Sequence, residues 1–441
     1  MLVMKFGGSS VADARQIHKA FEIVRGRLAR RPVVVSSAHK GVTDLLINAA
    51  KKAAAGGAAD ASPIVERQRK VLADLGCDAR MLDGYFREIE DLLRGIALLR
   101  EASPRVMDLI SSFGERMSVR AIADYFTRQG LPARAYDVYD LGFTTDDRFG
   151  AARPVAGYER AVAERFAAEV PPGVVPIITG FVGKTTAGEI TTVGRNGSDF
   201  TATCVAAALS ADECEIWTDT DGVMTADPSV IPEARTIPAM SFAEASELAY
   251  YGGRVLHPST LLPAVERKIP VRVLNTNRPD HPGTVITEEG AADAPPITSI
   301  AYKERQTVLT IESPRMLGQP GFLARIFDVL GRSSIDVDMI STSEVSVSMT
   351  CQDRGGLRAA LAELERHGHV TALAEKTIVC VVGQNLRRTR GVAARVFGAL
   401  DEAKVNVEMI SQGANQINLS FLIADADIAP AIRSLHRALF G

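Results

Sequence analysis

Met1-Leu-Val-Met-Lys-Phe-Gly-Gly-Ser-Ser10 joins a short apolar run to two glycines and two serines. The run Val3–Phe6 predicts a buried strand, and glycines directly after a strand let the backbone approach a ligand closely. With a helix following, exposed N–H groups form an anion cradle, to which Lys5 adds a positive charge. A tight turn with a solvated lysine is the alternative interpretation. The segment is not a Walker loop, because G-x-x-x-x-G-K-[ST] is absent.

The first part of the chain alternates short apolar runs with helical patterns, which is typical of an α/β fold. Such alternation predicts a mostly parallel sheet covered by helices on both faces. The charged stretch from about residue 60 to residue 100 is expected to be an accessory helical insertion. The other predicted strands are Pro32–Ser36, Val174–Thr179, Glu215–Thr218 and Pro270–Asn275, and the helical patterns are Asp13–Arg30, Val42–Ala55 and Arg105–Gln129.

A polar, proline-containing segment without periodicity, Glu288–Pro296, is the best linker in the chain. It predicts one domain over residues 1–288 and a second region over residues 297–441.

The second region contains an internal repeat at a constant offset of 70 residues. Gly321–Leu330 aligns with Gly391–Leu400, and Val337-Asp-Met-Ile-Ser341 aligns with Val407-Glu-Met-Ile-Ser411. Each copy has the pattern of a ferredoxin-like βαββαβ domain, the first over about residues 305–370 and the second over about 376–441. Such repeats need neighbours to cover their sheets, so the copies should pack together and against a second chain.

Composition excludes several classes of function. The chain has 441 residues, 46% of them hydrophobic, and a formal net charge of −3 without a basic tract, which argues against nucleic acid or an anionic membrane as partner. No signal peptide or membrane-spanning run is expected. The five cysteines are scattered, as in a protein of a reducing compartment without disulfides or a metal site. A cytoplasmic location is expected.

The loop Thr192-Val-Gly-Arg-Asn-Gly-Ser-Asp-Phe-Thr201 gathers a cation, an amide, hydroxyls and a carboxylate just before a predicted helix. Arg195 can grip a carboxylate with two parallel hydrogen bonds. The alternative is a hydrophilic loop whose helix is capped by Ser198 or Asp199.

Acidic groups follow or interrupt other elements. Trp217-Thr-Asp-Thr-Asp-Gly222 ends a strand and Thr225-Ala-Asp-Pro228 follows; their carboxylates can hold a ribose, an ammonium group or Mg²⁺. The pair Asp221-Gly222 is interpreted as a hairpin turn. Glu115, within Phe113–Ser118, is either a buried ligand for an amine or a helix-surface charge, and the surface interpretation is preferred on this segment alone.

Together these segments resemble the aspartate kinase family of the amino-acid kinase fold, and the repeat resembles its paired ACT domains. The resemblance covers nearly the whole chain. The matching motifs are Lys5-Phe-Gly-Gly-Ser9, Gly41-Val-Thr-Asp44, Phe113-Gly-Glu-Arg116, Gly194-Arg-Asn-Gly-Ser-Asp199, Trp217-Thr-Asp219, Val255-Leu-His-Pro258 and, in the repeat, Ser341-Thr-Ser-Glu-Val-Ser346.

The resemblance implies ATP-dependent phosphorylation of the β-carboxylate of L-aspartate, with Mg²⁺ arriving on ATP and no protein metal site. This is the first step of lysine, threonine and methionine biosynthesis. Lys5 and Asp199 are the implied catalytic residues. Aspartate is expected at Thr43, Glu115, Arg195, Asn196, Gly197 and Ser198. The nucleotide is expected at Lys5, Gly7, Gly8, Ser9, Thr218, Asp219, Met224, Asp227 and Arg254.

The resemblance also implies an amino-acid effector, with lysine favoured and threonine or no effector left open, and a homodimer or larger homo-oligomer formed through the ACT domains. Asp338 is expected to pair with the effector's ammonium group. The effector positions are Met316, Gly321, Phe322, Leu323, Val337, Asp338, Ser343 and Glu344, of which the apolar members would be core in any βαββαβ domain.

The sequence departs from the family pattern near the nucleotide and after the second strand. Ser229 and Met224 replace a cation and an aromatic, and Arg254 stands for a lysine. Ser37-Ala-His-Lys40 replaces a small, glycine-rich run. Two alternatives follow: another amino-acid kinase of the same fold, such as a glutamate or acetylglutamate kinase, or an amino-acid sensor without catalysis.

Overall fold

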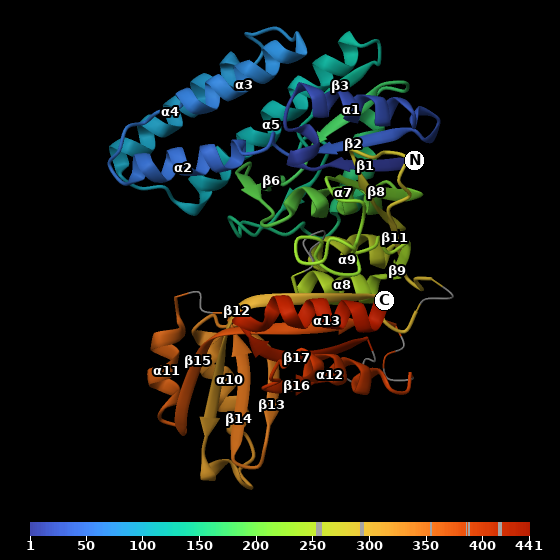
Figure 1. Cartoon of the computed structure of the whole chain (residues 1–441). Coiled ribbons are helices and arrows are strands. Elements are labelled where there is room, and N and C mark those ends of the chain that lie inside the picture. The colour runs from blue at the N-terminus through green and yellow to red at the C-terminus, as the bar shows by residue number, and fades with distance from the viewer. Residues whose placement is uncertain (253–257, 292–294, 353–354, 385, 387–388, 413–416) are drawn as a thin grey trace. The chain divides into compact units, whose positions relative to one another are not determined.

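The computed structural model describes residues 1–252, 258–291, 295–352, 355–384, 386, 389–412 and 417–441 (Figure 1). The chain divides into two compact units. The first contains residues 1–223, 238–242 and 255–290, and the second contains residues 224–237, 243–254 and 291–441. Two segments of the range predicted as the catalytic domain, 224–237 and 243–254, therefore cluster with the C-terminal part.

The first unit is built on an eight-stranded sheet with the order β3-β5-β2-β1-β8-β10-β11-β9. The strands from β3 to β10 pair in parallel, and β11 pairs antiparallel with β10. The predicted mostly parallel sheet is confirmed. In chain order the strands are β1 (Leu2–Phe6), β2 (Pro32–Ser36), β3 (Ala133–Tyr136), β5 (Val175–Thr179), β8 (Glu213–Thr218), β9 (Ala239–Ser241), β10 (Val271–Asn275) and β11 (Thr284–Thr287).

Helices cover both faces because side chains alternate along the buried strands. Met4 and Phe6 belong to a core shared with the helices on one face, whereas Lys5 reaches a helix on the other. The first face is covered by α1 (Ala14–Arg25), α2 (Val42–Ala54) and α5 (Pro104–Arg128), and the second by α6 (Tyr158–Glu169), α7 (Gly197–Ala208) and α9 (Pro258–Glu266).

The accessory insertion is helical, as predicted. Its helices α3 (Ser62–Leu75) and α4 (Asp83–Leu99) pack against α2, and α4 also contacts α5 (Figure 1). A small sheet of β4 (Thr144–Thr145), β6 (Val182–Thr185) and β7 (Ile190–Thr192) completes the unit.

The second unit contains a six-stranded antiparallel sheet with the order β13-β14-β12-β15-β17-β16. Among the described residues, no helix combines the length and apolar character needed to cross a bilayer. The strands of the second unit are β12 (Ser299–Glu312), β13 (Val337–Thr342), β14 (Ser346–Cys351), β15 (His369–Val382), β16 (Met409–Ser411) and β17 (Asn418–Ala424). Its helices are α8 (Phe242–Tyr250), α10 (Phe322–Arg332), α11 (Leu357–Leu364), α12 (Val392–Glu402) and α13 (Ile428–Phe440).

The two repeats share their central strands. The second half of β12 begins the first copy and pairs with β14, while its first half pairs with β15 from Ser299↔Val382 to Lys303↔Ile378. The first half of β12, which precedes the first copy, thus lies beside the strand β15 that begins the second copy. Arg305 and Glu375 have left-handed φ values of 58° and lie 70 residues apart, where β12 and β15 pass from one copy to the other. The structure contains both copies of the repeat, but the long strands β12 and β15 each belong partly to one copy and partly to the other.

Candidate active site

The carboxyl ends of the parallel strands converge at one edge of the large sheet, where open α/β sheets bind ligands. The loops that follow β1, β2, β5, β8 and β10 all begin at this edge because these strands run in the same direction. Backbone hydrogen bonds of 2.9–3.1 Å tie the loops together, from the N–H of Gly7 to Trp217, of Ser37 to Phe6, of Gly180 to Ser36 and of Thr276 to Thr218.

Lys5 and Asp199 form a buried ion pair at this edge. The Lys5 Nζ lies 2.5 Å from Asp199 Oδ1, and the two side chains are 10% and 9% exposed. Asp199 lies in the first turn of α7, which starts after Asn196 in a left-handed conformation with φ 54°. A Cβ on Gly7 would lie 3.3 Å from the Lys5 Nζ. The missing side chain at residue 7 therefore leaves room beside the ammonium group, and the solvated-lysine interpretation is wrong.

Glu115 is buried in the interior of α5, and the preferred surface interpretation is also wrong. The residue is 4% exposed, and its carboxylate accepts a hydrogen bond from the Ala38 backbone N–H. Its Oε2 has no hydrogen-bond partner among the described residues. Burial raises the pKa of Glu115 from 4.5 to about 8. A buried acid with a free oxygen is suited to receive a cationic group.

Thr43 lies beside the Glu115 turn. A Cβ on Gly114 would meet the Ala38 Cβ at 2.8 Å and the Thr43 Oγ1 at 3.4 Å. The loop after β2 and the first turn of α2 therefore pack directly on α5. Glycine at position 114 permits this close approach.

The loop between β7 and α7 presents a different set of predicted substrate residues. Arg195 and Asn196 are exposed, whereas Gly197 and Ser198 are buried. A Cβ on Gly180 would lie 2.6 Å from the Ser198 Oγ, so the loop after β5 closes on the start of α7. Arg195 thus lies on the loop that leads into the helix holding Asp199, four residues away.

The predicted nucleotide residues divide between the two units. Gly8 and Ser9 form part of the short helix η1 (Gly8–Val11), directly after Gly7, while Thr218 ends β8 and Asp219 follows it in the same unit. Met224 and Asp227 belong to the second unit. Arg254, together with most of the Val255–Pro258 motif, lies outside the described residues.

Several contacts at this edge were not predicted from the sequence. Ser10 accepts a hydrogen bond of 2.8 Å from Thr276 and donates one of 3.3 Å to the Trp217 carbonyl. Asp221 is more than a turn residue, since it accepts from the Asn275 Nδ2 at 2.7 Å and pairs with Arg278. Their place in the sequence could have indicated these contacts, because the residues lie at or just after the ends of parallel strands.

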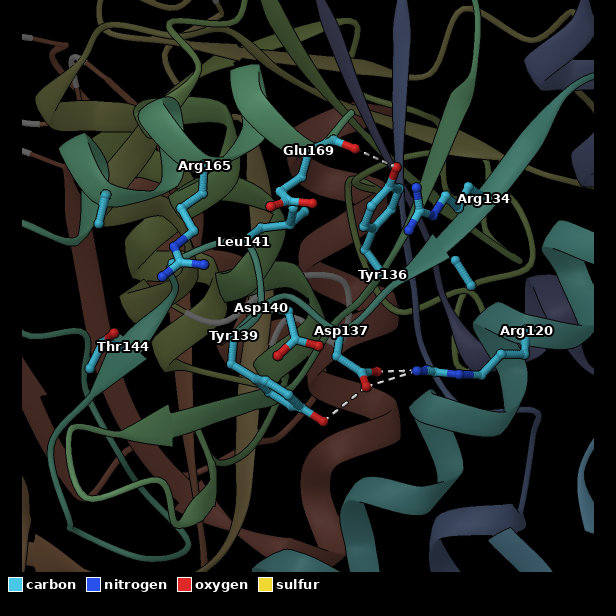
Figure 2. A pocket seen from close by; sticks show the side chains of 13 residues that line it. Arg120, Arg134, Tyr136, Asp137, Tyr139, Asp140, Leu141, Thr144, Arg165 and Glu169 are labelled. Atoms are coloured by element: carbon cyan, nitrogen blue, oxygen red, sulfur yellow. Dashed lines mark hydrogen bonds and ion pairs between the residues drawn. The ribbon is translucent and has the colours of Figure 1, made fainter. Parts of the chain in front are cut away.

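A surface hollow lies elsewhere on the same unit, near β3 and α6 (Figure 2). Figure 2 shows Arg120 and Tyr139 pointing at Asp137, which accepts two hydrogen bonds of 2.6 and 2.8 Å from Arg120 and one of 2.9 Å from Tyr139. None of the predicted site residues lines the hollow. The buried Asp137 carboxylate is already hydrogen-bonded to Arg120 and Tyr139, so it links α5 to the end of β3 in a structural role.

The predicted effector positions have two kinds of surroundings. Phe322 lies in the core of the first repeat, and Met316, Leu323 and Val337 pack against this core. These apolar residues therefore have the core positions expected in any βαββαβ domain. Gly321 precedes α10 with a left-handed φ of 82°, the Ser343 and Ser346 hydroxyls share a hydrogen bond, and Glu344 is exposed.

The carboxylate of Asp338 is already engaged within the chain. Its side chain is 2% exposed, and the Lys303 Nζ lies 2.6 Å from its Oδ2. The Tyr250 hydroxyl donates to the other oxygen, and the Lys303 ammonium lies 5.0 Å from the Tyr250 ring centroid. All three residues belong to the second unit. An ammonium group of the chain therefore occupies the place expected for the effector's ammonium.

Comparison with known proteins agrees with this architecture. Residues 1–275 match the amino acid kinase family, and residues 309–366 and 379–439 match the ACT domain. The chain is 39% identical to aspartokinase 1, chloroplastic, of Arabidopsis thaliana, over 99% of this chain and 80% of the relative. It is 36% identical to the lysine-sensitive aspartokinase 3 of Escherichia coli, over 100% of this chain and 99% of the relative.

A crystal structure of E. coli aspartokinase III in complex with aspartate and ADP superposes with a TM-score of 0.84 at 36% identity, covering 100% of both chains. Matches of this extent and identity, together with the kinase sheet and the paired repeats, place the chain plainly: it belongs to the aspartokinase family, with an amino-acid kinase fold and tandem ACT domains.

Proposed function

We propose that the chain transfers the γ-phosphoryl group of ATP to the β-carboxylate of L-aspartate, giving 4-phospho-L-aspartate for the biosynthesis of lysine, threonine and methionine. The buried Lys5–Asp199 pair at the carboxyl edge of the sheet is the observation that supports it most directly. A confined cation at this edge is suited to stabilise charge on a transferring phosphoryl group. The names of the relatives point to the same chemistry.

In this proposal aspartate is held at both of its charged ends. Glu115 receives the ammonium group, because its Oε2 is buried without a partner among the described residues. Arg195 binds the α-carboxylate, for which a guanidinium fork is well suited. Thr43, Asn196, Gly197 and Ser198 complete the cradle from the two loops that flank Glu115 and Asp199.

The residues present fit the polyphosphate of Mg-ATP. A Cβ on Gly7 would crowd the Lys5 Nζ, and a Cβ on Gly8 would lie 3.1 Å from the Ala38 carbonyl oxygen, so the glycines keep a cradle open beside a cation. Gly7, Gly8 and Ser9 would hold the phosphates, and Thr218 and Asp219 the nucleoside side. Bound Mg²⁺ would neutralise phosphate charge. Met224 and Asp227, which belong to the second unit, and Arg254, which lies outside the described residues, stay predictions from the sequence.

No covalent enzyme intermediate is required by this proposal. The β-carboxylate of aspartate is ionised at neutral pH, so the protein needs only to align it with the γ-phosphoryl group and to neutralise charge. Lys5 supplies the neutralising charge, and Asp199 orients the Lys5 ammonium group.

Regulation by lysine through the ACT repeats is the second part of the proposal. The relative named lysine-sensitive aspartokinase 3 is similar over its full length, and Asp338 has a carboxylate that already binds an alkyl ammonium group. The effector would therefore replace the Lys303 ammonium at Asp338, beside Gly321 and Ser343.

A homo-oligomer formed through the ACT repeats is proposed from the edges of the six-stranded sheet. Its end strands β13 and β16 expose Ile340 and Ile410, which are 38% and 51% exposed and occupy equivalent positions in the two copies. Edge strands with exposed apolar side chains favour association with another chain. The five cysteines are scattered through the sequence and buried, which fits a cytoplasmic location.

The proposed reaction is tested by ADP release with aspartate, glutamate or acetylglutamate as acceptor. Aspartate-dependent turnover is expected, with the other two acceptors much slower. Turnover with glutamate or acetylglutamate alone would assign a different kinase of the same fold. Binding of an amino acid without any turnover would identify a sensor.

Replacement of Lys5 tests the catalytic pair. Lys5→Met should lower kcat by roughly a hundred- to a thousand-fold, since one preorganised donor to the transition state is lost. Lys19→Met is the control, because Lys19 bonds Asn277 on the exposed side of α1 and should keep wild-type kcat. A folded Lys5→Met protein with normal kcat would contradict the role of Lys5.

The raised pKa of Glu115 predicts proton release on aspartate binding. Below pH 8 the free carboxyl is protonated, and it must ionise to hold an ammonium group, so aspartate affinity should rise with pH, on the order of fifty-fold from pH 6 to pH 8. Calorimetry in two buffers of different ionisation enthalpy measures the proton. Glu115→Gln should bind weakly at every pH; a wild-type affinity independent of pH would refute the assignment.

Removal of Lys303 tests competition for Asp338. Lys303→Met should lower the lysine concentration for half-inhibition about tenfold, because the effector no longer displaces an internal ammonium group. The matched control is Lys376→Met, since Lys376 pairs with Glu408, the residue that aligns with Asp338 at the offset of 70 residues, and it should leave inhibition unchanged. An unchanged or higher half-inhibitory concentration in Lys303→Met would argue against competition.

A further inference from the structure

His39 is buried in the loop that joins β2 to α2, and it bonds to the accessory helices. The residue is 1% exposed, and its Nδ1 lies 2.9 Å from the Oε1 of Gln68, a residue of α3 that is 0% exposed. Burial lowers the pKa of His39 to about 4, so the imidazole is neutral near pH 7. A neutral ring facing a carbonyl oxygen donates its Nδ1–H to it. The bond joins the accessory insertion to the edge of the sheet.

The backbone on either side of His39 contacts the proposed substrate site. The preceding residue, Ala38, donates its N–H to Glu115, and its carbonyl oxygen limits the space at Gly8. On the other side, the His39 carbonyl accepts a hydrogen bond of 3.0 Å from Val42, which fixes the turn before Thr43. A shift of the loop at residue 39 would therefore move two parts of the aspartate cradle together.

We infer that His39 is a positioning residue for aspartate: its hydrogen bond to Gln68 holds residues 37–41 so that the Ala38 N–H and the Thr43 hydroxyl stay beside Glu115. The inference rests on the proposed aspartate site. His39 acts through the loop and does not touch the reacting atoms. Because the nucleotide cradle is formed mainly by other loops, aspartate binding depends on this bond more than ATP binding does.

The alternative is that the pair only fills the interior. The Nε2 atoms of both residues are buried without a hydrogen-bond partner among the described residues. The pair therefore contributes little to the free energy of unfolding. Removing one partner leaves a buried polar group unpaired, whereas replacing both with apolar groups of similar shape is nearly neutral. This difference separates a structural role from a positioning role.

The experiment measures thermal unfolding, kcat and both KM values for His39→Leu, His39→Asn, Gln68→Leu and the double variant His39→Leu/Gln68→Leu. Each single leucine variant should raise the KM for aspartate about tenfold, the value of one neutral hydrogen bond, with the KM for ATP changed less than about twofold. His39→Asn should restore most of the aspartate KM, because its amide N–H replaces the Nδ1–H. The double variant should regain thermal stability but keep the raised aspartate KM.

Recovery of the aspartate KM in the double variant along with its stability would overturn the inference, as would equal changes in both KM values. If a single variant does not fold, the double variant and His39→Asn still decide. His18→Leu is the matched control, since its Nδ1 lies 2.9 Å from the Tyr125 hydroxyl on a different part of the unit, and it should keep both KM values. A wild-type protein without aspartate-dependent turnover would reject the proposed function itself, a separate outcome.

Discussion

The ion pair between Lys5 and Asp199 is the constraint on which the rest of the kinase unit depends. Two charges withdrawn from water are stable only when their elements hold them in close contact, and here these elements are the central strand β1 and the start of α7. The left-handed turn at Asn196 and the small residues Gly7 and Gly180 all serve that contact. The loops that would bind aspartate and ATP are arranged around it.

Burial has opposite effects on two other ionisable groups of the kinase unit, Glu115 and His39. It raises the pKa of Glu115 and lowers that of His39, so both side chains are neutral near pH 7 in the ligand-free protein. For Glu115 the neutral form is a resting state that a cationic substrate would reverse. For His39, with a pKa of about 4, the neutral form is the one present throughout the neutral pH range, which suits a residue whose role is to form a hydrogen bond.

Much of this arrangement could be predicted from the sequence, because strands, glycine turns and the repeat leave local patterns. The parallel sheet and the positions of Lys5 in β1 and of Asp199 in the first turn of α7 are examples. The burial of Glu115 could not be predicted, since it depends on the close packing of Gly114 on Ala38. The partner of Asp338 was also hidden, because Lys303 lies on a strand that serves both repeats. Local patterns do not reveal which distant strands pair.

The interleaved strands β12 and β15 make the two ACT copies inseparable. Each copy shares a strand with the other, so neither copy can be removed or unfolded independently. A distortion at one end of the shared sheet is transmitted to the other end, because β12 and β15 run through both copies. The two copies of the repeated sequence therefore respond to a load as one continuous hydrogen-bonded sheet.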